Sequence, residues 1–212
     1  MAEAGPGGKP SRNWKLWLAL VLLPVALAIL LSLGTWQVKR LAWKEDLLAA
    51  IEERSQADPV DIAAIEAAAE AGEPIDYRAA RATGRFLNDR ERHFFATFEG
   101  QSGYYVYTPL ELADGRLLFV NRGFVPYDRK DPDTRAEGLV EGQQTVTGLA
   151  RERLAAKPSF IVPENDVADN IFYWKDLDAM AGSAGLPSGE VLPFFLDADA
   201  SPVPGGLPRG GV

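Results

Sequence analysis

His93 is the only histidine in the chain. Its side chain is therefore the only imidazole that could act as a general base or bind a metal. It lies beside Phe94 and Phe95 in an aromatic-rich run, residues 92–98, that is typical of a β-strand. No nucleophile-elbow pattern supplies a serine for a Ser-His-Asp site. We therefore interpret His93 as a hydrogen-bonded structural or surface residue, and we expect no catalytic residue and no enzyme activity.

Thiolate and thioether ligands are almost missing, because the chain has no cysteine and two methionines. Without cysteine it has neither disulfides nor the motif for covalent haem attachment. Zinc, copper and iron–sulfur sites draw on Cys, His and Met, and one histidine is too few to build them. We exclude a copper carrier, a zinc enzyme and an iron–sulfur protein, and we expect no metal site.

Two pairs of carboxylates have a spacing that acid–base chemistry could use, Asp176 with Asp178 and Asp197 with Asp199. In a strongly acidic segment such pairs also arise by chance. We interpret the first pair as the start of a helix and the second as a turn.

Two short runs combine polar and aromatic residues in an unusual way. Asn121 and Arg122 end an aliphatic run and precede Gly123 and Pro126, and a buried arginine needs an acceptor. We expect Arg122 to anchor the charged excursion that follows, residues 128–141. The second run, residues 172–177, places three aromatics before a helix; they either pack in the core or contact a partner or ligand.

Residues 16–38 contain no charged side chain over 23 positions. As a helix this stretch measures about 34 Å, enough to cross a hydrocarbon core of about 30 Å. Tryptophans lie near both of its ends, at Trp14, Trp17 and Trp36, where indoles favour the membrane interface. The alternative is a cleaved signal peptide with the small residues Ser32 and Gly34 at its cleavage site. The length of the run and the flanking tryptophans favour a membrane anchor.

The charge distribution gives little guide to topology but excludes some partners. Residues 1–57 hold seven basic and five acidic residues, which leaves 15 basic and 25 acidic residues in 58–212. A segment this acidic is repelled by nucleic acid, so we exclude nucleic-acid binding. Three basic residues lie on each side of the apolar run, so the positive-inside rule decides little.

The chain divides into four parts: a mobile tail at 1–13, a transmembrane helix with an amphipathic extension at 14–57, a soluble domain at 58–201, and a Pro/Gly-rich tail at 202–212. Within the domain, Asp61 is expected to cap a helix at 62–71, and a second helix is expected at 176–184 before Gly185. Six strands are predicted, at 77–87, 92–98, 104–112, 116–124, 143–151 and 193–196. The fold class is α+β, with an antiparallel sheet or small open barrel and flanking helices.

Short runs at 34–37, 102–104, 120–126, 174–177 and 204–206, together with Arg40, 43–44 and 108–109, follow one another along the chain. They occur in the order found in the surfeit locus protein 1 family of cytochrome c oxidase assembly factors, which the chain resembles over residues 34–211. The matching stretches also include Thr134-Arg135, Phe160, Pro163-Glu164-Asn165 and Ala179-Met180-Ala181. The family-motif positions that we single out are Trp36, Gln37, Arg40, Trp43, Gly103, Tyr104, Pro109, Asn121, Arg122, Gly123, Pro126, Trp174, Asp176, Gly205 and Gly206.

The resemblance implies an assembly factor that helps to insert haem a into oxidase subunit I or stabilises that subunit. It implies membrane lipid, subunit I and haem a synthase as partners, with haem a as a transient cofactor. It also implies that the chain lies in a bacterial cytoplasmic membrane, with its soluble domain on the periplasmic side, or in the mitochondrial inner membrane. The alternative is a membrane-tethered ligand-binding or interaction module of another pathway.

The family pattern continues with a second transmembrane helix, and the histidine associated with haem a lies at its start. That position falls beyond Val212. His93 occupies a different place, so no haem ligand is assigned in this sequence.

Overall fold

The computed structural model describes residues 13–187 and 189–211. The chain forms two compact units, residues 1–51 and 52–212, and each is described by itself. The mobile tail predicted at 1–13 lies outside the described residues except for Asn13, where the first helix begins.

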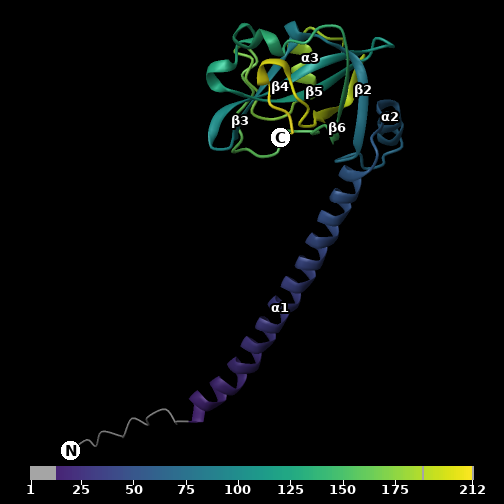
Figure 1. The fold of residues 1–212 in the computed structure, drawn as a ribbon. Helices are drawn as coiled ribbons and strands as arrows, with labels where there is room; N and C mark the ends of the chain where they lie inside the picture. The colour runs from purple at the N-terminus through teal and green to yellow at the C-terminus, as the bar shows by residue number, and fades with distance from the viewer. Residues whose placement is uncertain (1–12, 188, 212) are drawn as a thin grey trace, which may run out of the picture. The chain divides into compact units, whose positions relative to one another are not determined.

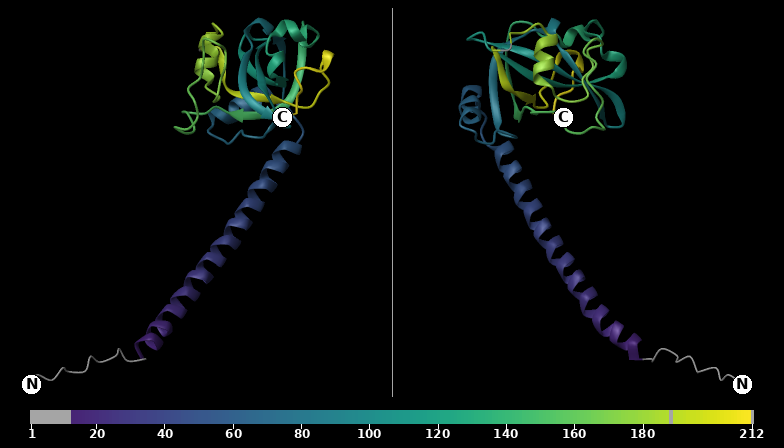
Figure 2. Two further views of the ribbon diagram at one scale, coloured as in Figure 1. Left: turned by 90° about the vertical axis from the view of Figure 1, so that its left-hand side faces the viewer. Right: turned by 180° about the vertical axis from the view of Figure 1, so that it is seen from behind.

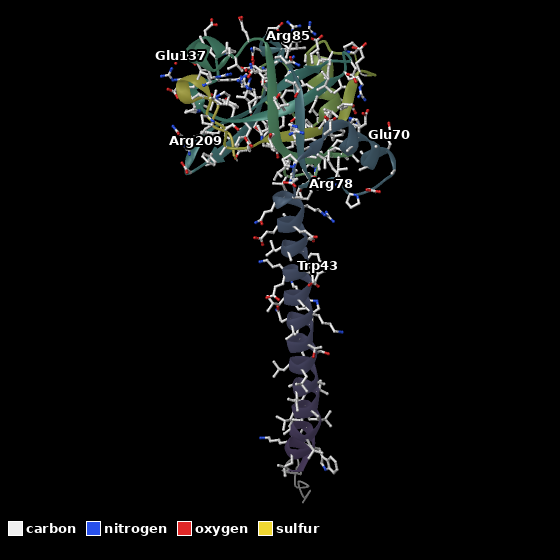
Figure 3. All side chains as sticks on the ribbon, turned by 45° about the vertical axis from the view of Figure 1, so that its right-hand side comes forward. Trp43, Glu70, Arg78, Arg85, Glu137 and Arg209 are labelled. Carbon is white, nitrogen blue, oxygen red and sulfur yellow. The ribbon has the colours of Figure 1, made fainter. Side chains whose placement is uncertain are left out.

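The helix α1 (Asn13–Gln56) is 44 residues long and contains Pro24. It is long and apolar enough to cross a membrane, and the side chains of its apolar span are exposed. Trp43, labelled in Figure 3, likewise projects from the helix and is 60% exposed. α1 passes without a break through Ser32 and Gly34, where the alternative interpretation places a cleavage site. An exposed aliphatic surface of this size needs an apolar environment such as lipid.

Seven strands form one sheet in the second unit (Figure 1). They are β1 (Val60–Asp61), β2 (Ala79–Phe86), β3 (Arg92–Phe98), β4 (Gln101–Leu112), β5 (Leu117–Pro126), β6 (Gln143–Glu152) and β7 (Val191–Ala198). The strand order is β1-β2-β6-β7-β5-β4-β3, and an additional pairing of β2 with β4 closes the five central strands into a barrel. Closure leaves no free edge among those five strands.

The predicted fold class, an α+β domain with a small barrel after an apolar helix, is confirmed. β3 has the predicted bounds, whereas β4 begins three residues earlier and β7 is twice as long as predicted. The sheet is mixed: β5 pairs with β7 in parallel, and the unpredicted β1 pairs with β2 in parallel. Parallel strands must be joined by a long crossover connection, and the one between β5 and β7 contains β6. The local sequence pattern of a strand does not reveal such a connection.

Within residues 52–187 and 189–211, two α-helices and four 3-10 helices accompany the sheet. Asp61 caps α2 (Ile62–Glu70) by accepting a hydrogen bond from the Ala63 amide, and Asp176 caps α3 (Leu177–Ser183) in the same way from Ala179. The cap at Asp61 and the helix start at Asp176 and Asp178 were predicted, whereas the capping hydrogen bond of Asp176 was not. The 3-10 helices are η1 (Asn88–Arg90), η2 (Tyr127–Arg129), η3 (Pro132–Gly138) and η4 (Pro204–Gly206).

Alternate residues of β5 serve two separate cores, as the pleat of a strand requires. Leu118 and Val120 are fully buried in the core that fills the barrel, together with Phe194 of β7. Phe119 belongs to a second core, in which Met180 of α3 packs against the outside of the sheet. Figure 2 shows α3 lying across the sheet in the view from behind. Asn121 and Arg122 continue these two rows, so their side chains leave β5 on opposite faces.

Replacing Phe194 by alanine tests the barrel core. Its side chain is fully buried, so Phe194→Ala should lower the free energy of unfolding by about 3–5 kcal/mol through lost burial and the cavity left behind. Phe160 is 92% exposed and provides a control of the same residue type. Phe160→Ala should change the free energy by less than about 0.5 kcal/mol. Urea unfolding of the detergent-solubilised chain measures both, and equal losses would contradict the assigned core.

Candidate functional site

The sequence motifs fall into two groups, one on each unit. Trp36, Gln37, Arg40 and Trp43 lie on α1 and are exposed. The Arg40 guanidinium lies 5.5 Å from the centre of the Trp36 ring, one helical turn away. The remaining motif residues belong to the barrel unit, and most of them gather around the end of β5.

Asn121 joins β5 to β7. Its Nδ2 donates to Asp197 Oδ1 at 3.0 Å, while its Oδ1 accepts a hydrogen bond from the Gly123 amide at 3.1 Å. Asp197 therefore lies within β7, opposite Asn121 in the parallel pair, and its predicted assignment to a turn is wrong. Asp199 does form a turn, since its Oδ1 accepts from the Ser201 amide.

Asp197 is also the centre of a group of charges on the α3 side of the sheet. Its Oδ2 lies 3.6 Å from Arg151 Nε and 3.9 Å from Lys175 Nζ. Burial lowers the pKa of Lys175 and raises the pKa of Tyr107 well above its ordinary value, and Asp197 adds to the rise. The Lys175 amino group lies 5.5 Å from the centre of the Tyr107 ring. The charges of Arg151 and Lys175 are thus partly balanced by Asp197.

The aromatic residues before α3 lie in two different environments. Phe172 is fully buried in the core under α3, so core packing is its role. Tyr173 and Trp174 are half-buried and line a cavity of about 350 Å³ together with Lys175. The indole Nε1 of Trp174 is buried and has no hydrogen-bond partner among the described residues.

Arg122 leaves the opposite face of β5 and is 5% exposed. Its Nη1 donates to Asn88 Oδ1 at 3.1 Å, and its Nη2 donates to the carbonyl oxygen of Gly138 at the end of η3. The guanidinium lies 4.5 Å from the centre of the Phe86 ring. The prediction that Arg122 anchors the excursion after β5 is therefore confirmed.

Gly123 allows the C-terminal segment to lie against β5. Its φ angle is +117°, and an added Cβ would lie 2.0 Å from the carbonyl oxygen of Arg209. The next residue, Phe124, exchanges two backbone hydrogen bonds of 2.9 Å with Arg209. Gly205 and Gly206 both have positive φ in η4, which turns the chain toward this pairing.

Glu91, His93 and Arg135 form a buried polar cluster beside this region. Glu91 Oε1 accepts a hydrogen bond from Arg135 Nη2 and lies 3.1 Å from His93 Nε2. The Asn170 Nδ2 lies 3.0 Å from His93 Nδ1, and as a donor it requires Nδ1 to accept and Nε2 to donate to Glu91. His93 is 3% exposed, so its interpretation as a structural residue is confirmed.

Four motif residues have roles in packing. Gly103 faces Pro126 across β4 and β5, and a Cβ on it would lie 2.1 Å from a backbone oxygen. Tyr104 packs edge-on against His93, and burial together with the hydrogen bond to Tyr127 raises its pKa to about 12. The Pro109 carbonyl accepts from the Leu87 amide at 2.8 Å.

The arrangement therefore holds together segments of the barrel unit that are distant in the sequence. Within the described ranges, no group of three His, Asp or Glu residues is placed to hold a metal ion. Sequence reasoning missed Glu91 and Asn170 and assigned no site role to Arg135. The position of Glu91 just before a predicted strand did not indicate that its side chain is buried.

The chain matches one protein-family model and several named proteins. The model of the SURF1 family matches residues 25–210. Proteins named Surfeit locus protein 1 from Rattus norvegicus and Homo sapiens are each 35% identical to it, over 85% and 99% of the chain respectively. A SURF1-like protein from Monosiga brevicollis is 34% identical over 94% of the chain. The chain spans 61% of the rat protein's length and 71% of the human protein's length.

Gly123→Ala tests the close approach of the C-terminal segment to β5. The added methyl meets the Arg209 carbonyl and the φ angle disfavours a side chain, so we expect a loss of at least about 2 kcal/mol in the free energy of unfolding. Gly182 lies in α3 with open space around it, so Gly182→Ala should leave stability unchanged or raise it by up to about 1 kcal/mol. Thermal unfolding of the two variants checks the difference. A harmless Gly123→Ala would contradict the pairing.

Glu91→Gln tests the buried cluster. It leaves the Arg135 side chain, which is 1% exposed, without a charged partner, and we expect a loss of about 3–5 kcal/mol. Glu99→Gln removes a carboxylate from an exposed pair with Arg209 and should cost less than about 1 kcal/mol.

The same cluster predicts a pH dependence. Burial raises the pKa of Glu91, but the hydrogen bond to His93 and the interactions with Arg135 outweigh it, so the folded pKa lies below its ordinary 4.5. A carboxyl group with a lowered pKa stabilises the fold above its unfolded pKa and loses that contribution as pH falls through the folded value. Unfolding free energies measured between pH 7 and 3 should therefore fall more steeply in the parent chain than in Glu91→Gln. Parallel curves would exclude this role for Glu91.

Proposed function

The chain belongs to the SURF1 family, and we propose that it is a membrane-anchored assembly factor for cytochrome c oxidase. The observation that carries this proposal is the family match over residues 25–210, which takes in both the apolar helix and the barrel. The motif residues in the barrel unit support a non-catalytic role, because they cap a helix, bridge strands and hold loops. None of them forms a nucleophile–base pair with a neighbour.

The apolar helix α1 marks the chain as a membrane-associated protein. We propose further that α1 remains as the anchor and is not removed as a signal peptide. On this proposal the barrel lies on the periplasmic side of a bacterial cytoplasmic membrane or in the mitochondrial intermembrane space. Membrane lipid is then its constant partner.

The proposed step is help with haem a insertion into subunit I, or stabilisation of that subunit, with haem a synthase as a further partner. His93 does not fit the role of an axial haem ligand in this step. It is 3% exposed, and both of its ring nitrogens are engaged, by Glu91 and by Asn170. Haem a, if this chain contacts it, is therefore held by other groups, and no residue here is assigned to it.

Deleting the gene tests the proposed function. Oxidase activity and haem a bound in the oxidase, measured from spectra of the membranes, should fall severalfold, while the cells still synthesise haem a. The full chain should restore both quantities, and so should Gly182→Ala, whereas Gly123→Ala should restore less because it destabilises the domain. Unchanged oxidase in the deletion strain would reject the proposal and favour an interaction module of another pathway.

A further inference from the structure

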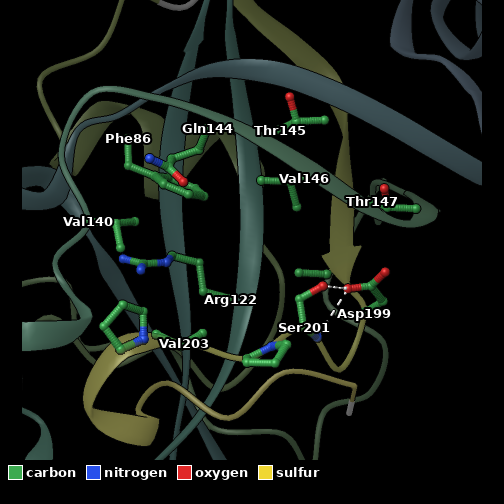
Figure 4. A pocket seen from close by; sticks show the side chains of 13 residues that line it. Phe86, Arg122, Val140, Gln144, Thr145, Val146, Thr147, Asp199, Ser201 and Val203 are labelled. Atoms are coloured by element: carbon green, nitrogen blue, oxygen red, sulfur yellow. Dashed lines mark hydrogen bonds between the residues drawn. The ribbon is translucent and has the colours of Figure 1, made fainter.

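Arg122 lies in the wall of a cavity of about 240 Å³ between β6 and the segment that follows β7 (Figure 4). Phe86, Val140, Val146 and Val203 make much of its wall apolar. A cavity of about 150 Å³ with apolar walls is large enough to bind benzene. This one therefore has room for a small organic group.

The charge of Arg122 has no carboxylate partner. Among the described residues no Asp or Glu oxygen lies within 4.0 Å of its nitrogens, and its two hydrogen bonds go to the neutral oxygens of Asn88 and Gly138. Burial lowers the pKa of Arg122, and the more distant Glu91 offsets this only in part. Arg135, which is equally buried, shows the contrast, since Glu91 neutralises it. A buried cation is costly unless an anion accompanies it.

The guanidinium retains the capacity to bind an anion. Arginine has five N–H donors, and the bonds to Asn88 and Gly138 use two of them, which leaves three. A guanidinium matches the two oxygens of a carboxylate or a phosphate. Asp199, the acidic residue in the wall, lies at the far side of the cavity in Figure 4 and is bonded to Ser201.

We propose that this cavity binds a carboxylate on a short apolar stem, with the carboxylate on Arg122 and the stem against Phe86, Val140 and Val203. The apolar wall distinguishes such a ligand from inorganic phosphate, which would leave this surface uncovered. The carboxylate can belong to a free small acid or to the end of a larger amphiphile whose remainder emerges from the opening. This inference is independent of the oxidase role.

Titration of the full chain in detergent with butyrate tests the proposal. Butyramide, which has the same shape without the charge, and inorganic phosphate form separate arms at matched ionic strength, with binding followed by the saturable rise in Tm. We expect butyrate to bind at least tenfold more tightly than butyramide and more tightly than phosphate. Equal binding of butyrate and butyramide would overturn the proposal, and tighter binding of phosphate would overturn the ligand class.

Two cavity variants and one control variant test whether butyrate binds in this cavity. Arg122→Gln should abolish the preference for butyrate over butyramide, whereas Arg209→Gln, which alters an exposed arginine outside the cavity, should retain it. Because Arg122 also anchors η3, its replacement is expected to destabilise the fold. Val203→Phe provides a second test that fills the cavity and keeps the guanidinium. A folded Arg122→Gln or Val203→Phe chain with the preference intact would refute the site.

A longer acid distinguishes the two sources of the carboxylate. Octanoate should bind at least as tightly as butyrate if the stem emerges from the opening into a larger amphiphile. If octanoate binds more weakly than butyrate, the cavity takes a free small acid. Failure of octanoate together with butyrate would reject the carboxylate site in both forms.

Discussion

The carbonyl oxygen of Gly138 accepts a hydrogen bond from the buried guanidinium of Arg122, and the backbone of Phe124 pairs with that of Arg209 two residues further along β5. These contacts tie the excursion after β5 and the C-terminal segment to one strand. That strand is also bonded to β4 and β7 within the barrel. The end of β5 is thus the place where the closed barrel, the excursion after β5 and the C-terminal segment are joined.

The two faces of β5 explain why neighbouring residues of one motif act in different ways. Asn121 shares its face with the core under α3 and completes the link to Asp197. Arg122 shares its face with the barrel core and reaches the excursion instead. A polar residue in each buried row is tolerated because each side chain finds fixed acceptors.

Local patterns in the sequence predicted much of the fold. The bounds of β3, the cap at Asp61, the helix start at Asp176 and the apolar helix follow from side-chain type and spacing over a few residues. The parallel pairing of β5 with β7 did not follow, because it depends on packing between segments about 70 residues apart in the chain. Asp197 was misread for the same reason, since its partner Asn121 is distant in sequence.

The candidate site was predicted in part. An acceptor for Arg122 was predicted because burying an arginine without a partner costs free energy. In the structure the carbonyl oxygen of Gly138 is that acceptor. Glu91 was not predicted, because its charge gives no local sign of burial and its partner Arg135 is 44 residues away. Relations of this kind become visible only when the barrel brings the segments together.

The central claim is that the C-terminal segment and the barrel fold as one unit through β5. Native-state hydrogen exchange of the full chain tests it most directly by comparing the Arg209 amide, which donates to Phe124, with the slow amides inside β5. The account predicts that Arg209 exchanges with the same opening free energy as those β5 amides. An Arg209 amide that opens at much lower free energy, independently of β5, would contradict it.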